Sequence, residues 1–241
     1  AHARDQLVHP HLDRLGELVV VAGGERDGRF ERPHHLVLRP AWIRPIGAIA
    51  AVVKAHGGIL IVDAVQSLGR IPLDITTGCG DFFIVSSHKI GGPKGVGAII
   101  GVTDLMMPVP LLRGGGQEKG RRSGTEALPA IAGFGAAAKL VPERLARAGE
   151  LAVMRDRIEA LVIAAAPDAV FHGHQAAARL PNTTFFSYAE MNAETLQIAF
   201  DLQKIAVSAG SACSSGKVGP SHVLKAMGLD GTGGAIRVSV S

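Results

Sequence analysis

The pattern of apolar and polar positions becomes regular after residue 45. Residues 46–56 are mostly apolar and are followed by Gly57-Gly58, which predicts a helix and its end. Continuous apolar runs follow at 59–62, 81–85 and 96–102. Uninterrupted runs of this length are typical of strands that are buried on both faces. An earlier strand is expected at 18–22, whereas 29–44 shows no clear period.

The second half of the chain alternates longer helical patterns with short strands. Helices are expected at 126–140, 143–166, 193–204 and 220–227. The helix at 143–166 is predicted to be amphipathic, with its Arg and Glu residues facing solvent. Strands are expected at 183–187, 206–208 and 235–241.

These elements together predict an α/β fold with a mixed, mostly parallel sheet and flanking helices. We place a domain boundary near Val141-Pro142. Residues 1–141 would form a large domain, and 142–241 a smaller α+β domain. The ligand site of such a fold is expected beyond the carboxyl ends of its strands.

Composition narrows the possible functions. The 241 residues are 47% hydrophobic but only 4% aromatic, so the core must be largely aliphatic. The net charge is only +4 and the basic cluster at 119–122 is short, whereas a nucleic-acid-binding surface would need a larger basic patch. We therefore expect no nucleic-acid partner. No Cys-x-x-Cys or His-Glu-x-x-His spacing indicates a metal site.

The number of cysteines and the hydropathy of the chain indicate its cellular compartment. The two cysteines are too few for a disulfide framework and suit a reducing cytosol. No run of ~20 apolar residues or signal peptide is found, so no membrane partner is expected. We therefore expect a cytoplasmic protein.

Two polar segments follow successive predicted strands. Asp63 comes directly after 59–62, and Ser86-Ser87-His88-Lys89 follows 81–85. A lysine can form a Schiff base with an aldehyde cofactor, and an aspartate can keep a pyridine nitrogen protonated. Taken singly, Asp63 would be a turn residue and Lys89 a surface residue. Their order along the chain favours a pyridoxal 5'-phosphate site.

Five spaced motifs resemble the cysteine desulfurases of the NifS and IscS type, which are class V, fold-type I pyridoxal-phosphate enzymes. The order and approximate separations match from about residue 46 to the end of the chain. The motifs are Val62-Asp63-Ala64-Val65-Gln66-Ser67, Ser86-Ser87-His88-Lys89, Gly91-Gly92-Pro93-Lys94-Gly95-Val96-Gly97, Arg122-Ser123-Gly124-Thr125-Glu126 and Gly210-Ser211-Ala212-Cys213.

The resemblance implies how the cofactor would be held. Lys89 would form the internal Schiff base, Asp63 would pair with the pyridinium nitrogen, and Gln66 would pair with the ring oxygen. Ser86 and His88 would bind the phosphate. In a homodimer, Thr125 of the other subunit would be a third phosphate ligand.

The resemblance also implies roles for two residues toward the substrate, L-cysteine. Arg237 would grip its carboxylate, a task that suits a bidentate guanidinium. Cys213 would be the nucleophile that takes the sulfur as a persulfide and releases alanine. The sulfur would then pass to an acceptor, such as an iron–sulfur scaffold protein.

The chain also departs from the family pattern. It lacks a Gly- and Thr-rich phosphate loop upstream of Asp63, the histidine that stacks on the cofactor ring, and the helices that follow the Arg237 strand. We therefore expect a family sequence shortened at both ends. Two alternatives stay open: a selenocysteine lyase or other class V aminotransferase, and a catalytically impaired fragment that acts only in dimerisation or partner binding.

Overall fold

The computed structural model describes most of the chain from residue 45 onward and a few short strands before it. The described residues are 19–22, 25–26, 29–30, 34–36, 45–103, 108–176, 178–189, 191–209 and 234–241. The helix expected at 220–227 and the cysteine loop around Cys213 lie outside these residues.

The predicted elements from residue 45 to 209 are present, with ends shifted by a few residues. In chain order, the described helices and strands are β1 (Val19–Ala22), β2 (Glu25–Arg26), β3 (Arg29–Phe30), β4 (His34–Leu36), α1 (Ile46–Ala55), β5 (Ile59–Asp63), η2 (Ile75–Thr77), β6 (Phe82–Ser86), η3 (Ser87–Ile90), β7 (Gly97–Gly101), η4 (Gln117–Gly120), α2 (Leu128–Lys139), α3 (Val141–Ala146), α4 (Ala148–Ala165), β8 (Val170–Phe171), β9 (Thr183–Tyr188), α5 (Ala193–Leu202), β10 (Ser208–Ala209) and β11 (Gly234–Ser239). None of the helices in this described part is long and apolar enough to cross a membrane.

The chain divides into two compact units. Among the described residues, the large-sheet unit comprises those within 19–35 and 46–146, and the small-sheet unit is formed mainly by those within 147–241. Along the chain, the main change from one unit to the other comes between α3 and α4. Each unit has its own sheet and its own buried residues.

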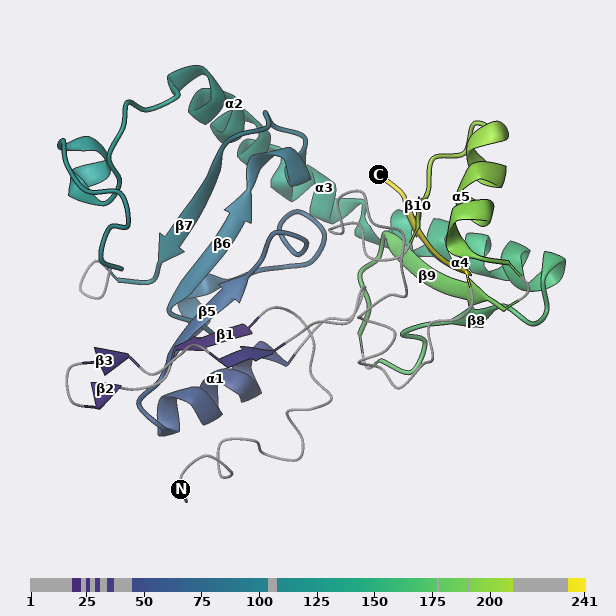
Figure 1. Cartoon of the computed structure of the whole chain (residues 1–241), viewed down its shortest axis with the longest axis horizontal. Helices are drawn as coiled ribbons and strands as arrows, with labels where there is room; N and C mark the ends of the chain where they lie inside the picture. Colours follow the sequence, from purple (N-terminus) through teal and green to yellow (C-terminus); the bar gives the residue numbers. More distant parts are fainter. Residues whose placement is uncertain are drawn as a thin grey trace. The chain divides into compact units, whose positions relative to one another are not determined.

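The large sheet has the strand order β4-β1-β5-β6-β7 (Figure 1). Strands β5 and β6 are parallel, whereas β1–β5 and β6–β7 are antiparallel. The mixed α/β sheet is confirmed, but the expected predominance of parallel pairs is wrong for the pairs whose register is described. The connection of 87–96 between β6 and β7 explains part of this difference, because a parallel pair needs a longer crossover.

Buried and more exposed side chains alternate along the central strands, so that one face of the large sheet is covered and the other is open. Leu60 and Val62 of β5 and Phe83 and Val85 of β6 are buried. Helix α1 contacts β5 and buries its own apolar side chains, Ile49, Ala50 and Val53. On the opposite face, Ile84 is 36% exposed and its cross-strand partner Ile99 is 57% exposed.

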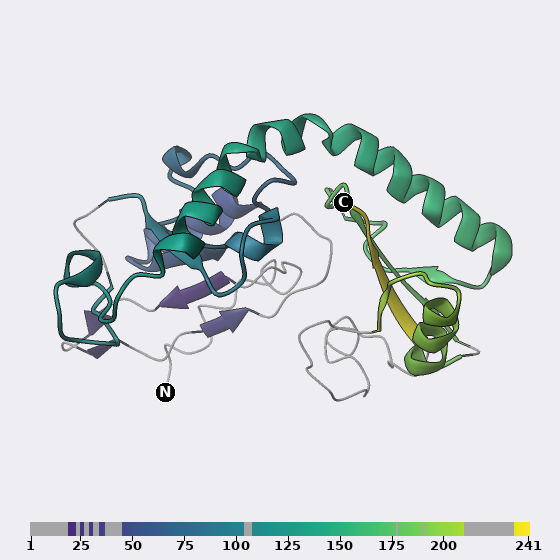
Figure 2. The ribbon, with the colours of Figure 1, turned by 90° about the horizontal axis from the view of Figure 1, so that it is seen from above.

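The small sheet has the order β10-β11-β9-β8 and is antiparallel throughout. Phe185 of β9 and Ile236 of β11 are almost completely buried. Helix α5 contacts β11 and β10, and α4 contacts β9. In Figure 2, the yellow strand β11 can be followed beside the green helix α5.

Helix α4 does not have the predicted amphipathic arrangement. Glu159 is 5% exposed, although the sequence pattern placed the acidic side chains in solvent. Val153 and Leu161 are 70% and 61% exposed. The prediction was wrong because Glu159 finds polar partners inside the small-sheet unit, where Arg179 and Thr184 donate to its carboxylate. A buried carboxylate with such partners is tolerated, whereas an unpaired one is not.

Candidate active site

Asp63 and the lysine segment meet at the carboxyl edge of the parallel pair. Asp63 is the last residue of β5 and lies in register with Ile84, so Ser86 follows two residues further along β6. Since residues in register, and residues two apart, share a face, Asp63, Ile84 and Ser86 all belong to the open face. The structure therefore confirms the predicted position of the two segments at strand ends.

The Asp63 carboxylate is half-buried and oriented by its own turn. Its Oδ1 accepts a hydrogen bond of 3.0 Å from the Val65 amide. The Ala64 amide continues the parallel ladder by donating to the Ile84 carbonyl at 2.9 Å. Within the described residues Oδ2 makes no hydrogen bond, so it is available to a ligand.

Lys89 lies on a short turn between β6 and β7, here called the lysine turn (residues 87–96). The Ser87 amide donates to the Val96 carbonyl at 3.1 Å and closes this turn. The first residues form η3, which ends at Gly91 in the left-handed conformation, φ 77°. Lys89 is half-buried there. A lysine held in a closed turn is preoriented compared with one on a free loop.

The two predicted phosphate ligands of the lysine segment contact each other. Ser86 Oγ and His88 Nδ1 are 2.8 Å apart and share a hydrogen bond. Ser86 is half-buried and His88 is exposed at the same edge. Two polar groups that converge in this way can both reach one phosphate oxygen.

Gln66 and Thr125 are exposed in the large-sheet unit. Gln66 follows Asp63 by three residues, and its carbonyl accepts from Arg70 at 3.0 Å. Thr125 lies before α2, which begins at Leu128 with Ala127 as its N-cap, so the expected helix start at Glu126 is two residues too early. The bend before it is held by Arg122, which donates to the Gly124 carbonyl at 2.6 Å. Thr125 is therefore accessible from solvent.

Of the two residues expected to act on the substrate, Arg237 belongs to the small-sheet unit. Arg237 lies in β11, opposite Phe185 of β9 and Ser208 of β10. Its guanidinium donates to Ser208 Oγ at 3.5 Å. Cys213 lies outside the described residues, so its predicted role stays a prediction.

Comparison with known proteins identifies the family. The model of the class-V aminotransferases matches residues 41–241. The chain belongs to the class-V aminotransferase family.

Relatives within this family include cysteine desulfurases. A cysteine desulfurase of Trichormus azollae is 43% identical over 199 residues, and the match covers 81% of this chain and 49% of the relative. One of Enterobacter agglomerans is 32% identical over 257 residues, covering all of this chain and 64% of the relative. The structure of a NifS-like protein from Rickettsia africae ESF-5 aligns with a TM-score of 0.74 at 34% identity, covering 83% of this chain and 53% of that one. The chain thus spans about half to two thirds of the length of these relatives.

Arg70 is a residue of this class-V aminotransferase that sequence reasoning missed. Its guanidinium donates to the Gln66 carbonyl at 3.0 Å and to the Lys89 carbonyl at 3.2 Å. No local pattern predicts this bridge, because Arg70 and Lys89 are 19 residues apart. The only signal is its position four residues after Gln66, within reach of that residue's carbonyl.

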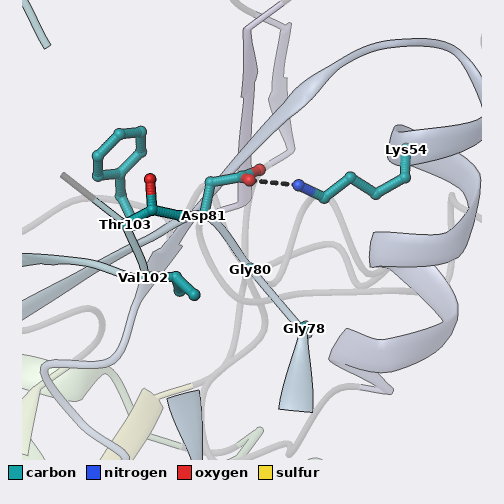
Figure 3. A pocket seen from close by; sticks show the side chains of 7 residues that line it. Lys54, Gly78, Gly80, Asp81, Val102 and Thr103 are labelled. Atoms are coloured by element: carbon teal, nitrogen blue, oxygen red, sulfur yellow. Dashed lines mark hydrogen bonds and ion pairs between the residues drawn. The ribbon is translucent and has the colours of Figure 1, made fainter. Parts of the chain in front are cut away.

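A cavity of about 280 Å³ lies at the other end of β6, before Phe82 (Figure 3). The Lys54 ammonium and the Asp81 carboxylate form an ion pair there, and Asp81 also accepts from the Leu60 amide at 2.8 Å. None of the predicted site residues lines this cavity. Since Asp81 and Lys54 satisfy each other and tie α1 to β5 and β6, this pair is structural.

Proposed function

We propose that this class-V aminotransferase chain is the part of a cysteine desulfurase that carries the cofactor lysine and the sulfur-accepting cysteine. The cofactor would be pyridoxal 5'-phosphate, the substrate L-cysteine, and the sulfur would serve iron–sulfur cluster assembly. The observation that carries the proposal is the meeting of Asp63 with Ser86, His88 and Lys89 at one strand edge.

The residues present fit the cofactor. The ring nitrogen needs an acid that stays charged, and Asp63 offers an oxygen with no hydrogen bond in the described part of the chain. The phosphate needs convergent donors, and Ser86 and His88 already lie within hydrogen-bonding distance of each other. Lys89, which follows His88 on the lysine turn, supplies an amine and completes the set.

Each residue of the large-sheet unit would then have one task. Bound pyridoxal phosphate supplies the electron sink for bond breaking at the substrate α-carbon. Asp63 keeps the ring nitrogen protonated, and Gln66 donates to the ring oxygen. Ser86 and His88 donate to the phosphate, and Lys89 supplies the amine for covalent attachment. Thr125 would donate to the phosphate held by the other subunit of a homodimer.

The small-sheet unit would supply the groups that handle the substrate. Arg237 would bind its carboxylate through two parallel hydrogen bonds. The Cys213 thiolate would attack the sulfur of the substrate cysteine. A new S–S bond then forms and the Cβ–S bond breaks. Its electron pair stays on the substrate β-carbon, which takes up a proton on the way to alanine, and Cys213 is left as a persulfide.

The lysine assignment is tested by mixing the purified chain with pyridoxal 5'-phosphate. We expect visible absorbance, and after borohydride reduction a pyridoxyl group on Lys89 that peptide mass spectrometry can locate. Lys89→Ala should lose both signals, whereas Lys94→Ala, an exposed lysine of the same turn, should keep them. A Lys89→Ala chain that still gains the absorbance would contradict the assignment.

The cysteine assignment is tested by measuring alanine and sulfide released from L-cysteine in the presence of a thiol. Cys213→Ser should lose sulfide release and keep the cofactor absorbance. The matched control is Cys79→Ser, because Cys79 is the other cysteine and lies in the large-sheet unit near η2. Equal sulfide yields from wild type and Cys213→Ser would contradict the nucleophile role.

A second candidate function is dimerisation or partner binding by a chain without catalysis. The observation that favours it is the open face of the large sheet, which leaves Ile99 57% exposed. A colourless chain that gains no absorbance with the cofactor but associates stably would support this function.

The alternative of a selenocysteine lyase is tested by comparing the rates of alanine release from cysteine and from selenocysteine.

A further inference from the structure

The lysine turn and the loop that follows Asp63 are held together by one side chain. Arg70 donates through one terminal nitrogen to the Gln66 carbonyl at 3.0 Å and through the other to the Lys89 carbonyl at 3.2 Å. Both acceptors are backbone carbonyls of predicted site residues. Because the guanidinium is planar and rigid, it fixes the separation of the two carbonyls that it binds.

The Lys89 carbonyl needs such a donor. It lies in the last turn of η3, where carbonyls have no partner within the helix. Among the described hydrogen bonds its partner is Arg70. A cation at the carboxyl end of a helical turn is also favoured by the local dipole.

The packing around Arg70 leaves little freedom to the two loops. Gly69 has φ 76°, and a Cβ added there would lie 3.4 Å from Ile90 Cγ2. Gly91 has φ 77°, and an added Cβ would lie 2.7 Å from the Arg144 guanidinium. Glycine at both positions therefore lets the loops and Arg144 approach closely. Burial and the neighbouring charge of Arg144 lower the pKa of Arg70.

We propose that Arg70 is a positioning residue that sets the orientation of Lys89 relative to the Asp63–Gln66 loop by binding the carbonyls of Gln66 and Lys89. This inference rests on the proposed function, because it gives Lys89 the task of capturing the cofactor. Arg70 would act through the backbone of these residues and would not touch the cofactor.

Two measurements on the full chain test the proposal. The first is hydrogen–deuterium exchange without cofactor in a peptide covering 87–92, whose Gly91 and Gly92 amides both donate to the Ser87 carbonyl. Arg70→Gln should speed exchange in this peptide about tenfold, while a peptide covering β7 keeps the wild-type rate and shows that the sheet is folded. The second is the rate at which Lys89 is modified by pyridoxal 5'-phosphate, trapped with borohydride.

Three variants separate the effect of the planar guanidinium, which binds two carbonyls at once, from the effect of its positive charge. Arg70→Gln should lower the trapping rate at Lys89 about tenfold and leave trapping at Lys94 unchanged. Arg70→Lys, which keeps the charge without the rigid spacing, should lower the rate about threefold. Arg144→Gln removes a neighbouring charge that binds neither carbonyl in the described residues, and it should stay within about twofold of wild type.

The outcomes distinguish this inference from the proposed function. Unchanged exchange in the 87–92 peptide of Arg70→Gln would overturn the bridge. Trapping at Lys89 that is equal in wild type and Arg70→Gln would overturn the positioning role alone. A wild-type chain that gives no adduct at Lys89 would overturn the proposed function, and the exchange result would still decide whether Arg70 holds the turn.

Discussion

Glu159 is the centre of a buried polar cluster in the small-sheet unit. Its carboxylate accepts hydrogen bonds from Arg179 and Thr184 and lies 2.7 Å from His174 Nε2. Burial acts to raise its pKa, but the hydrogen bonds from Arg179, Thr184 and His174 and the charge of Arg179 outweigh it and lower the pKa to about 2. The charged form is therefore the one that the fold stabilises.

The first prediction concerns the pH dependence of stability at this residue. A folded-state pKa below the ordinary 4.5 contributes stability above about pH 4.5, and this contribution is lost as the pH falls from there toward 2. Glu159→Gln leaves Arg179 without its counter-charge, so at pH 7 we expect a loss of about 3 kcal/mol. The difference in unfolding free energy between wild type and variant should shrink as the pH falls through this window.

Urea unfolding at a series of pH values measures this difference. Glu150→Gln is the matched control on the same helix, because Glu150 is exposed and its one ion pair within the described residues is with Arg147. Its effect should stay within about 0.5 kcal/mol at every pH. A Glu159→Gln difference that does not change with pH would contradict the pKa assigned to Glu159.

At the scale of elements, α2 supports the lysine turn. A Cβ added at Gly133 of α2 would lie 2.5 Å from Pro93 Cγ, and one added at Gly92 would lie 3.2 Å from Ala137 Cβ. Gly133 and Ala137 are four residues apart and therefore share one face of the helix. That face is packed against the turn at the positions just after Lys89.

This packing predicts opposite effects for two glycines of one helix. Gly133→Ala should destabilise the chain by about 1–3 kcal/mol, because the new methyl group meets the rigid ring of Pro93. Gly135→Ala should stabilise it by about 0.5–1 kcal/mol, because nothing lies within 4 Å of the added Cβ and alanine favours the helix. Chemical denaturation of both variants measures the effect, and equal changes would contradict the packing.

The sequence predicts these elements better than it predicts how they pair. Apolar runs bounded by glycine and polar residues locate β5, β6 and β7 to within a residue or two, and with them Asp63 and Lys89. An apolar run carries no information about strand direction, so the antiparallel β7 was missed. Arg70 and Glu159 were missed because their partners are distant in sequence, at separations of 19 residues for Arg70 and Lys89 and of 15–25 residues for Glu159.

At the scale of the whole molecule, the described part of the large sheet ends in the apolar strand β7. Within the described part of the chain β7 is the last strand of its sheet, and Gly97–Gly101 contains no charge and no proline. Ile99 is 57% exposed on the open face. Apolar edge strands of this kind pair with other chains unless they are covered.

We therefore expect the isolated chain to self-associate with rising concentration. Ile99→Lys should shift it toward the monomer, because a charge on an edge strand opposes pairing. Val153→Lys adds the same charge at an exposed residue of α4. It should have a smaller effect, because the backbone groups inside a helix are already hydrogen-bonded and cannot pair with another chain. Light scattering coupled to size exclusion measures both. A wild-type chain that stays monomeric at all concentrations would contradict this expectation.

Most of the large-sheet unit precedes most of the small-sheet unit along the chain, and this order bears on the sequence of events during synthesis. Residues 46–146 precede 147–241 and make their contacts largely among themselves and with 19–35. Domains generally fold as units from the amino terminus while the ribosome is still adding residues. Under the proposed function, the lysine turn would thus be complete before Arg237 and Cys213 have been translated, and the nascent chain could bind the cofactor before it can bind the substrate.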